Sequence, residues 1–169
     1  TVVQVCREHL PEVSGNLSDP RVRFIFDDGV RYAAETDPVY DVIIVDSSDP
    51  IGPAEQLFEL EFYQNLRNAL KPGGMLVCQT ESPIFHWDVL HRSYTYLHSL
   101  FSHTKLYRAP VPTYPGGMWS FTLATDAVAS DGQLQVQRKL PKTRYITDDL
   151  LKSCFDIPGF ITDRLQQKD

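Results

Sequence analysis

The feature that most constrains this chain is the short run Tyr40–Val45 (YDVIIV), which is apolar and rich in β-branched residues. Such a run is typical of a strand that is buried on both faces of a parallel sheet. It ends at the polar sequence Asp46-Ser47-Ser48-Asp49-Pro50. In sheets of this kind, ligands bind beyond the carboxyl ends of the strands. The run therefore predicts an α/β protein with a site at this strand end.

Strand-like and helix-like segments alternate along the rest of the chain. The predicted strands are 21–26, 40–45, 75–79, 105–112 and 118–124. The predicted helices are 1–10, 29–35, 57–70, 86–101 and two short ones after residue 148, separated by a break at 158–159. Alternation followed by a strand pair predicts a mainly parallel sheet with an antiparallel edge, in one domain without repeats.

Charge and composition exclude several classes of protein. The 169 residues carry a net charge of −6 and no basic run, so nucleic acid is not an expected partner. The apolar runs are well short of the roughly 20 residues that span a bilayer, so no membrane association is expected. The three cysteines, Cys6, Cys78 and Cys154, have neither a disulfide framework nor zinc-site spacing. This cysteine usage favours a reducing cytoplasm.

Acidic and amide side chains follow three of the predicted strands. They are Asp27, Asp28, Asp46, Asp49, Gln79 and Glu81. Clustered carboxylates repel one another unless a cation balances them. The histidines form no pair aimed at the strand ends, which disfavours a metal and leaves an amine as the expected cation. The simpler alternative for an isolated Asp46 and Asp49 pair is a helix cap and an Asx turn.

An amine substrate would use two carboxylates in different ways. Taking the proton from a primary amine at neutral pH costs about 5 kcal/mol and makes the amine a nucleophile. A second carboxylate can anchor the far ammonium of a diamine. Tyr114, in a turn bounded by prolines, offers an aromatic wall and a hydroxyl. Trp119 is close enough to that turn for either a core role or a ligand role.

Asp28 and Gly29 follow another strand end and suit the recognition of a nucleoside. The carboxylate can accept a hydrogen bond from an exocyclic amino group, and a glycine permits close approach of a flat ring. A turn without a ligand is the alternative.

Five motifs together resemble the spermidine synthase family of aminopropyltransferases. They are DDG at 27–29, DVIIVDSSDPIGPAE at 41–55, LKPGG at 70–74, QTES at 79–82 and PTYPGG at 112–117. The resemblance implies a Rossmann-like, methyltransferase-type domain that transfers an aminopropyl group from decarboxylated S-adenosylmethionine to putrescine. The products are spermidine and methylthioadenosine, and neither a cofactor nor a metal is implied. A homodimer is implied for the full-length protein.

The same resemblance implies a role for each matched residue. Asp46 would accept the proton of the attacking amine, and Asp49 would hold the diamine. Gln79, Glu81 and Tyr114 would complete the amine pocket, directly or through water. The residues implied at the donor are Asp28 and Gly29 against the adenine, with Pro53, Ala54 and Leu57 along its apolar side.

The chain departs from the family pattern at several points. Family members begin with a small β-rich domain and carry a Gly-rich donor loop, which this chain lacks. Residues 1–169 are therefore expected to be a partial catalytic domain that is inactive alone, binds the donor weakly and folds only with the missing part. Thr80 stands where many members have Gly, and Met118-Trp119-Ser120 differs from the common eukaryotic pattern. The second difference borders the implied amine pocket and leaves the choice of amine open.

Three other functions fit parts of the sequence. The first is a transferase on the same scaffold, such as an aminopropyltransferase for agmatine or spermidine, or a putrescine N-methyltransferase. The second is a noncatalytic aminopropyltransferase-like partner domain, against which the presence of both Asp46 and Asp49 argues. The third uses Thr1 as an N-terminal nucleophile, which the helical character of residues 1–10 disfavours.

Overall fold

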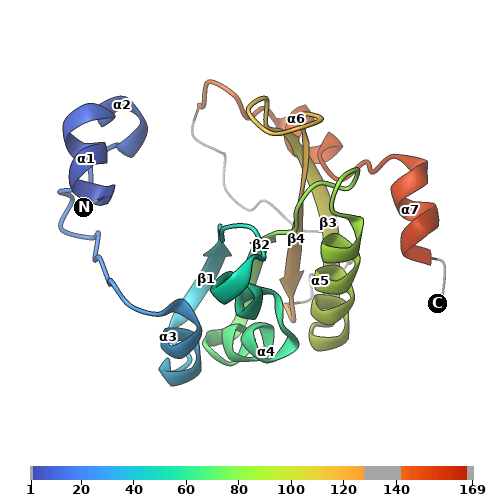
Figure 1. The fold of residues 1–169 in the computed structure, drawn as a ribbon, viewed down its shortest axis with the longest axis horizontal. Coiled ribbons are helices and arrows are strands. Elements are labelled where there is room, and N and C mark those ends of the chain that lie inside the picture. The colour runs from blue at the N-terminus through green and yellow to red at the C-terminus, as the bar shows by residue number, and fades with distance from the viewer. Residues whose placement is uncertain (1, 128–141, 167–169) are drawn as a thin grey trace.

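A four-stranded sheet forms the centre of the molecule (Figure 1). The computed structural model describes residues 2–127 and 142–166. The strands are β1 (Tyr40–Val45), β2 (Leu70–Gln79), β3 (His103–Pro110) and β4 (Met118–Thr125), in the order β1-β2-β4-β3. β1 pairs with β2 in parallel, and β4 is antiparallel to both β2 and β3. The predicted α/β class is confirmed, with β4 as the one reversed strand among those described.

The reversed strand does not lie at the edge of the sheet. After β2, helix α5 (Trp87–Leu100) carries the chain past the neighbouring position, so β3 forms the edge. The turn after β3 then returns β4 into the space between β3 and β2. The antiparallel strand pair predicted from the sequence is therefore present, with its second strand on the inside.

The helices follow the sequence-based expectation closely after residue 28. They are α1 (Val2–His9), α2 (Pro11–Ser14), α3 (Gly29–Glu35), the 3₁₀ helix η1 (Gly52–Phe58), α4 (Leu60–Asn68), α5, α6 (Asp148–Ser153) and α7 (Gly159–Gln166). The helix predicted at 57–70 is divided, because Glu59 has an extended backbone that ends η1 and precedes α4. Within the described ranges, every helix is too short or too polar to traverse a lipid bilayer.

The strand predicted at 21–26 is wrong. These residues form an irregular connection between α2 and α3 (Figure 1). Val22, Ile25 and Phe26 are exposed, Phe26 to 78%. A strand needs a hydrogen-bonded neighbour, and no described residue pairs with this segment. Its β propensity alone was not sufficient to make it a strand.

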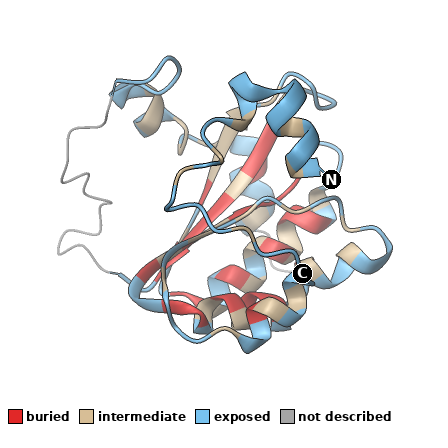
Figure 2. Cartoon of the chain, turned by 90° about the vertical axis from the view of Figure 1, so that its left-hand side faces the viewer, coloured by how far each residue is buried: buried red, intermediate tan, exposed pale blue. Residues whose placement is uncertain are grey.

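The main core lies between one face of the sheet and helices α3, α4 and α5. Figure 2 shows the buried residues along the strands and on the helix surfaces turned toward them. The largest group is Ala33, Phe62, Tyr63, Leu66, Leu70, Leu76, Cys78, Leu97, Phe101 and Ala124. A smaller cluster of Leu90, Leu106 and Ile161 attaches α7 to α5 and β3. The core therefore supports the sheet directly beneath β2 and β4.

The two faces of β1 are not equally buried. Ile43 and Val45 pack against the main core, whereas Val42 and Ile44 are 54% and 73% exposed. Successive side chains of a strand point to opposite faces, and α3, α4 and α5 cover only one of them. The predicted burial of this strand on both faces is therefore wrong for the part of the chain that the structure describes.

We expect the free energy of unfolding to fall as the pH rises above about 9. Burial raises the pKa of the Cys78 thiol and of the Tyr63 hydroxyl above their ordinary values of 9.0 and 10.0. The unfolded chain then loses these protons at a lower pH than the folded chain does. The stability that the two protonated groups contribute is fully present below pH 9. It is lost as the pH rises toward their folded-state pKa values.

Urea unfolding at pH values of about 8 and 10.5 measures this effect. Tyr63→Phe and Cys78→Ala remove the two groups, so the double variant should lose less stability over this interval than the unsubstituted protein. An equal loss in both proteins would contradict the assignment.

Candidate functional site

The register of the sheet places the acidic turn beside the end of β2. Val45 of β1 pairs with Cys78 of β2, so Asp46 and Gln79 follow at the same edge of the sheet. Asp46 and Asp49 are exposed, and their carboxylates have no hydrogen-bond or ion-pair partner within residues 2–127 and 142–166. Ile51, which precedes η1, caps it without a side-chain hydrogen bond. Neither aspartate is thus used as a cap, and both carboxylates are available to a cation.

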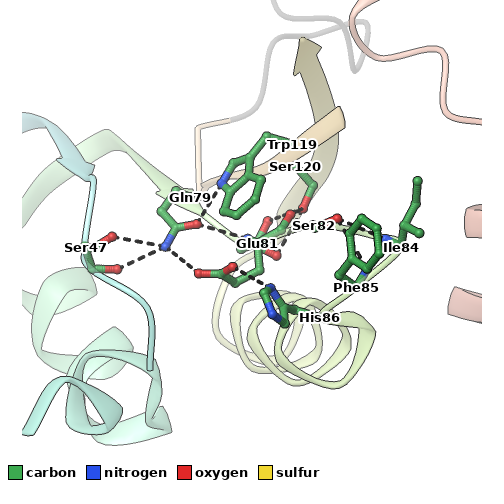
Figure 3. A network of polar contacts seen from close by, with 10 residues as sticks. Ser47, Gln79, Glu81, Ser82, Ile84, Phe85, His86, Trp119 and Ser120 are labelled. Carbon is green, nitrogen blue, oxygen red and sulfur yellow. Dashed lines mark hydrogen bonds and ion pairs between the residues drawn. The ribbon is translucent and has the colours of Figure 1, made fainter. Parts of the chain in front are cut away.

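Gln79 holds the peptide between these two aspartates (Figure 3). Its Nε2 donates to the Ser47 backbone oxygen at 3.2 Å and to Glu81 Oε1 at 3.1 Å. Its Oε1 accepts from Trp119 Nε1 and from the Glu81 backbone N–H, both at 3.0 Å. Both N–H groups and both lone pairs of the amide are therefore engaged, which determines its orientation. Gln79 acts here as a support for the turn.

Glu81 is a carboxylate with no exposed surface in the interior of the protein. Its Oε2 lies 3.0 Å from His86 Nδ1, and its backbone oxygen accepts from the Ser120 N–H at 3.0 Å. Its φ is 68°, the one positive value for a residue other than glycine in the described chain. A backbone held in this region costs about 1–3 kcal/mol and is typical of functional sites. The structure thus maintains both a strained backbone and a fully buried carboxyl group at the end of β2.

The PTYPGG turn brings an aromatic wall to the same network. The ring of Tyr114, which is 47% exposed, packs on the buried Trp119 with centroids 4.4 Å apart. Gly116 has a φ of 76°, and a Cβ there would lie 3.0 Å from Phe85 Cε2. Only glycine fits this turn without displacing Phe85. Trp119, which the sequence left open, joins Tyr114 to Gln79.

Asp28 and Gly29 lie where α3 meets η1. Asp28 Oδ1 caps α3 by accepting from the backbone N–H groups of Val30 and Arg31 at 2.8 and 3.1 Å. A Cβ at Gly29 would lie 3.8 Å from Leu57 Cδ2, so these two predicted donor residues are adjacent. The cap uses one carboxylate oxygen of Asp28. This is a structural role that Asp28 fills without a ligand.

The neighbouring Asp27 is engaged within the protein. It accepts from the Asp28 N–H at 2.8 Å and pairs with Arg31. The backbone hydrogen bond first, and Arg31 second, hold the pKa of the Asp27 carboxyl below its usual value. At the start of α3, Asp27 is thus paired with a cation of the protein, whereas Asp28 serves the helix as a cap through Oδ1 alone.

Comparison with known proteins agrees with this arrangement. Residues 1–133 match the family model described as the spermine/spermidine synthase domain. The chain belongs to the spermine/spermidine synthase family. This confirms the resemblance inferred from the five motifs.

Relatives and solved structures of the family cover nearly the whole chain. The polyamine aminopropyltransferase of Moorella thermoacetica is 44% identical over 168 residues, which are 98% of this chain and 58% of that protein. A spermidine synthase in complex with the transition-state analogue AdoDATO superposes with a TM-score of 0.87 at 29% identity, covering 97% of this chain and 57% of that one. The spermidine synthase from Thermotoga maritima gives 0.84 at 30% identity, with 97% and 55% covered. The chain thus spans less than two thirds of the length of these relatives.

In the present structure, a pocket of about 360 Å³ lies at the opposite end of the sheet, near the start of β2. Its Arg67 guanidinium is paired with Asp126 at 2.8 Å, and Lys71 nearby pairs with Asp41 at 2.9 Å. The charged groups there are satisfied within the protein, in contrast to Asp46 and Asp49. The carboxyl ends of β1 and β2 therefore offer the better binding site.

The residues predicted for the site fall into two groups in the fold, and their binding roles stay predictions. Asp46, Asp49, Gln79, Glu81 and Tyr114 surround the end of β2 or precede it on the acidic turn. The second group lies at the start of α3 and on η1: Asp28, Gly29, Pro53, Ala54 and Leu57. Within the described residues, no three or more His, Cys, Asp or Glu side chains are arranged to hold a metal ion.

Sequence reasoning missed Ser47 and His86 as members of the network. Ser47 lies inside the acidic motif. Its backbone oxygen, which every residue type has, accepts from Gln79 Nε2 at 3.2 Å, and its hydroxyl oxygen lies 3.5 Å from the same nitrogen. His86 entered the sequence analysis only among the histidines that form no metal-binding pair. Its position five residues after Glu81, at the start of a helix, was the available signal.

Proposed function

We propose that this chain carries the amine-activating site of an aminopropyltransferase that uses decarboxylated S-adenosylmethionine and putrescine. The observation that carries the proposal is the turn with Asp46 and Asp49. It bears two exposed carboxylates without a protein partner in the described chain, and its peptide is held by a buried amide. A diamine supplies two positive charges that this pair can share.

Asp46 is assigned the proton transfer. It follows β1 directly and precedes Ser47, whose backbone oxygen accepts from Gln79. The carboxylate takes a proton from one ammonium of putrescine, which leaves a neutral amine with a free lone pair. That lone pair attacks the methylene next to the sulfonium of the donor. The new C–N bond forms as the C–S bond breaks, and its electron pair stays on sulfur as a neutral thioether.

Asp49 is assigned the second ammonium of the diamine. It lies three residues further along the turn, so the two carboxylates present separate points of charge. The aromatic pair of Tyr114 and Trp119 is connected to the same turn through the Trp119–Gln79 hydrogen bond. Because the leaving group is neutral, the reaction requires no metal or organic cofactor to stabilise it, and positioning is the main contribution of the protein.

The donor is assigned to the junction of α3 and η1. The oxygen of Asp28 that does not cap α3 suits an exocyclic amino group, and Gly29 permits a flat ring to approach. Pro53, Ala54 and Leu57 offer apolar surface on η1. One solved family member was crystallised with the transition-state analogue AdoDATO, which supports a site for both substrates on this scaffold.

The full-length protein that contains this chain tests the proposal. It should convert decarboxylated S-adenosylmethionine and putrescine into methylthioadenosine and spermidine, detected by mass spectrometry. Agmatine and spermidine in place of putrescine identify the preferred amine, and S-adenosylmethionine in place of the donor detects N-methyl transfer. Methylated putrescine as the main product, or no product from any pair, would contradict the proposal.

A further inference from the structure

His86 is the outermost member of the network around the acidic turn (Figure 3). Its side chain is 50% exposed, whereas the Glu81 side chain to which it is bonded has no exposed surface. It occupies the N-cap position of α5 but makes no side-chain capping bond there. Within the described residues, His86 is the one basic side chain that pairs with Glu81. The imidazole thus forms its hydrogen bond with the Glu81 carboxyl group and does not cap the helix.

The backbone around His86 is arranged to hold the imidazole in this position. Ser82 Oγ accepts from the backbone N–H groups of Ile84 and Phe85, both at 3.3 Å, and the His86 N–H donates to the Ser82 oxygen at 3.0 Å. These bonds form a compact turn between Glu81 and α5. The hydrogen bonds of this turn therefore determine the position of His86, although its ring is half exposed to solvent.

A continuous set of hydrogen bonds leads from His86 to the acidic turn. In the Nδ1–H tautomer, His86 donates to Glu81 Oε2 at 3.0 Å; Gln79 Nε2 donates to Glu81 Oε1 at 3.1 Å and to the Ser47 backbone oxygen at 3.2 Å. A buried carboxylate oxygen that loses its donor carries an uncompensated desolvation penalty. Relief of that penalty requires Glu81 to move, and Gln79 would move with it.

We propose that His86 is a positioning residue for the amine acceptor. The hydrogen bond of His86 to Glu81 keeps the Glu81 carboxyl group in place, and Glu81 in turn orients Gln79 toward the Ser47 backbone oxygen. This contact holds Asp46 and Asp49 in the geometry that receives the diamine. The assignment of a diamine rests on the proposed function, whereas the support of the turn does not. His86 contacts no substrate in this role.

Substitutions at His86 separate this role from a merely structural one. His86→Leu and His86→Ala remove the donor, whereas the Nδ2 group of His86→Asn can take the place of Nδ1. In the full-length protein, Leu or Ala should lower kcat/KM for the diamine about tenfold and leave KM for the sulfonium donor within about twofold. Asn should restore most of kcat/KM. His98→Leu is a matched control, because His98 lies exposed on the same helix outside the network.

Hydrogen exchange of the same variants reads the position of Gln79 without any turnover. The Glu81 amide, whose N–H donates to Gln79 Oε1, should exchange several-fold faster in His86→Leu and His86→Ala than in the unsubstituted protein, His86→Asn or His98→Leu. Unchanged exchange in the Leu and Ala variants, or an equal loss in the Asn variant, would overturn the proposal. Faster exchange in a protein that transfers no aminopropyl group would support the role of His86 and overturn only the proposed function.

Discussion

Replacement of Asp46 by Asn should lower kcat for aminopropyl transfer by about a thousandfold in the full-length protein. Asn has nearly the shape of Asp but cannot take the proton of the attacking amine, which then stays protonated and has no lone pair to donate. The exposed carboxylate has no partner in the described chain, so little folding stability depends on it. Steady-state kinetics with saturating putrescine and donor measure the effect, and thermal unfolding confirms that the variant is folded.

Asp41→Asn is the matched control for this experiment. Asp41 lies on the same strand, β1, with its side chain 81% exposed and paired with Lys71 at 2.9 Å. An exposed pair of this kind contributes little, and the control should retain kcat within about twofold. A decrease of less than about tenfold for Asp46→Asn would exclude Asp46 as the proton acceptor.

Replacement of Asp49 by Asn should raise KM for the diamine about a hundredfold and change kcat much less. The distal ammonium of the diamine loses its counter-charge, while Asp46 still activates the reacting amine. The effect should therefore depend on the presence of a second charge in the acceptor.

A monoamine provides the decisive comparison for Asp49. Butylamine has the reacting amine of putrescine but lacks its distal ammonium, so Asp49→Asn should leave its kcat/KM nearly unchanged. The loss seen with putrescine and not with butylamine would locate the anchor at Asp49. Equal losses with both amines would show that Asp49 does not bind the distal charge.

The predicted site depended on information that is local in the sequence. Asp46 and Asp49 directly follow a β-branched run, Gln79 and Glu81 follow the next strand, and parallel strands bring their carboxyl ends to one edge. The register that pairs Val45 with Cys78 confirms that adjacency. Helices such as α5 were also predictable, because their apolar spacing and terminal residues lie within one segment.

Other properties depended on what packs against a residue. The run 21–26 has the composition of a strand but no described partner, and Val42 and Ile44 are exposed because the helices cover only the other face of β1. Propensity and hydrophobicity indicate which secondary structure and which burial a segment can adopt. The residues that pack against it determine whether it adopts them.

The sequence by itself determined most helices and strands after residue 28, the acidic turn after β1 and the family, since these follow from residue types at short spacing. Only the tertiary structure decided that Glu81 is fully buried and that all the hydrogen-bonding groups of Gln79 are engaged. It also decided that His86 satisfies Glu81. The physical reason is that burial and hydrogen-bond partners come from residues that are distant in sequence, as Trp119 and Ser47 are from Gln79.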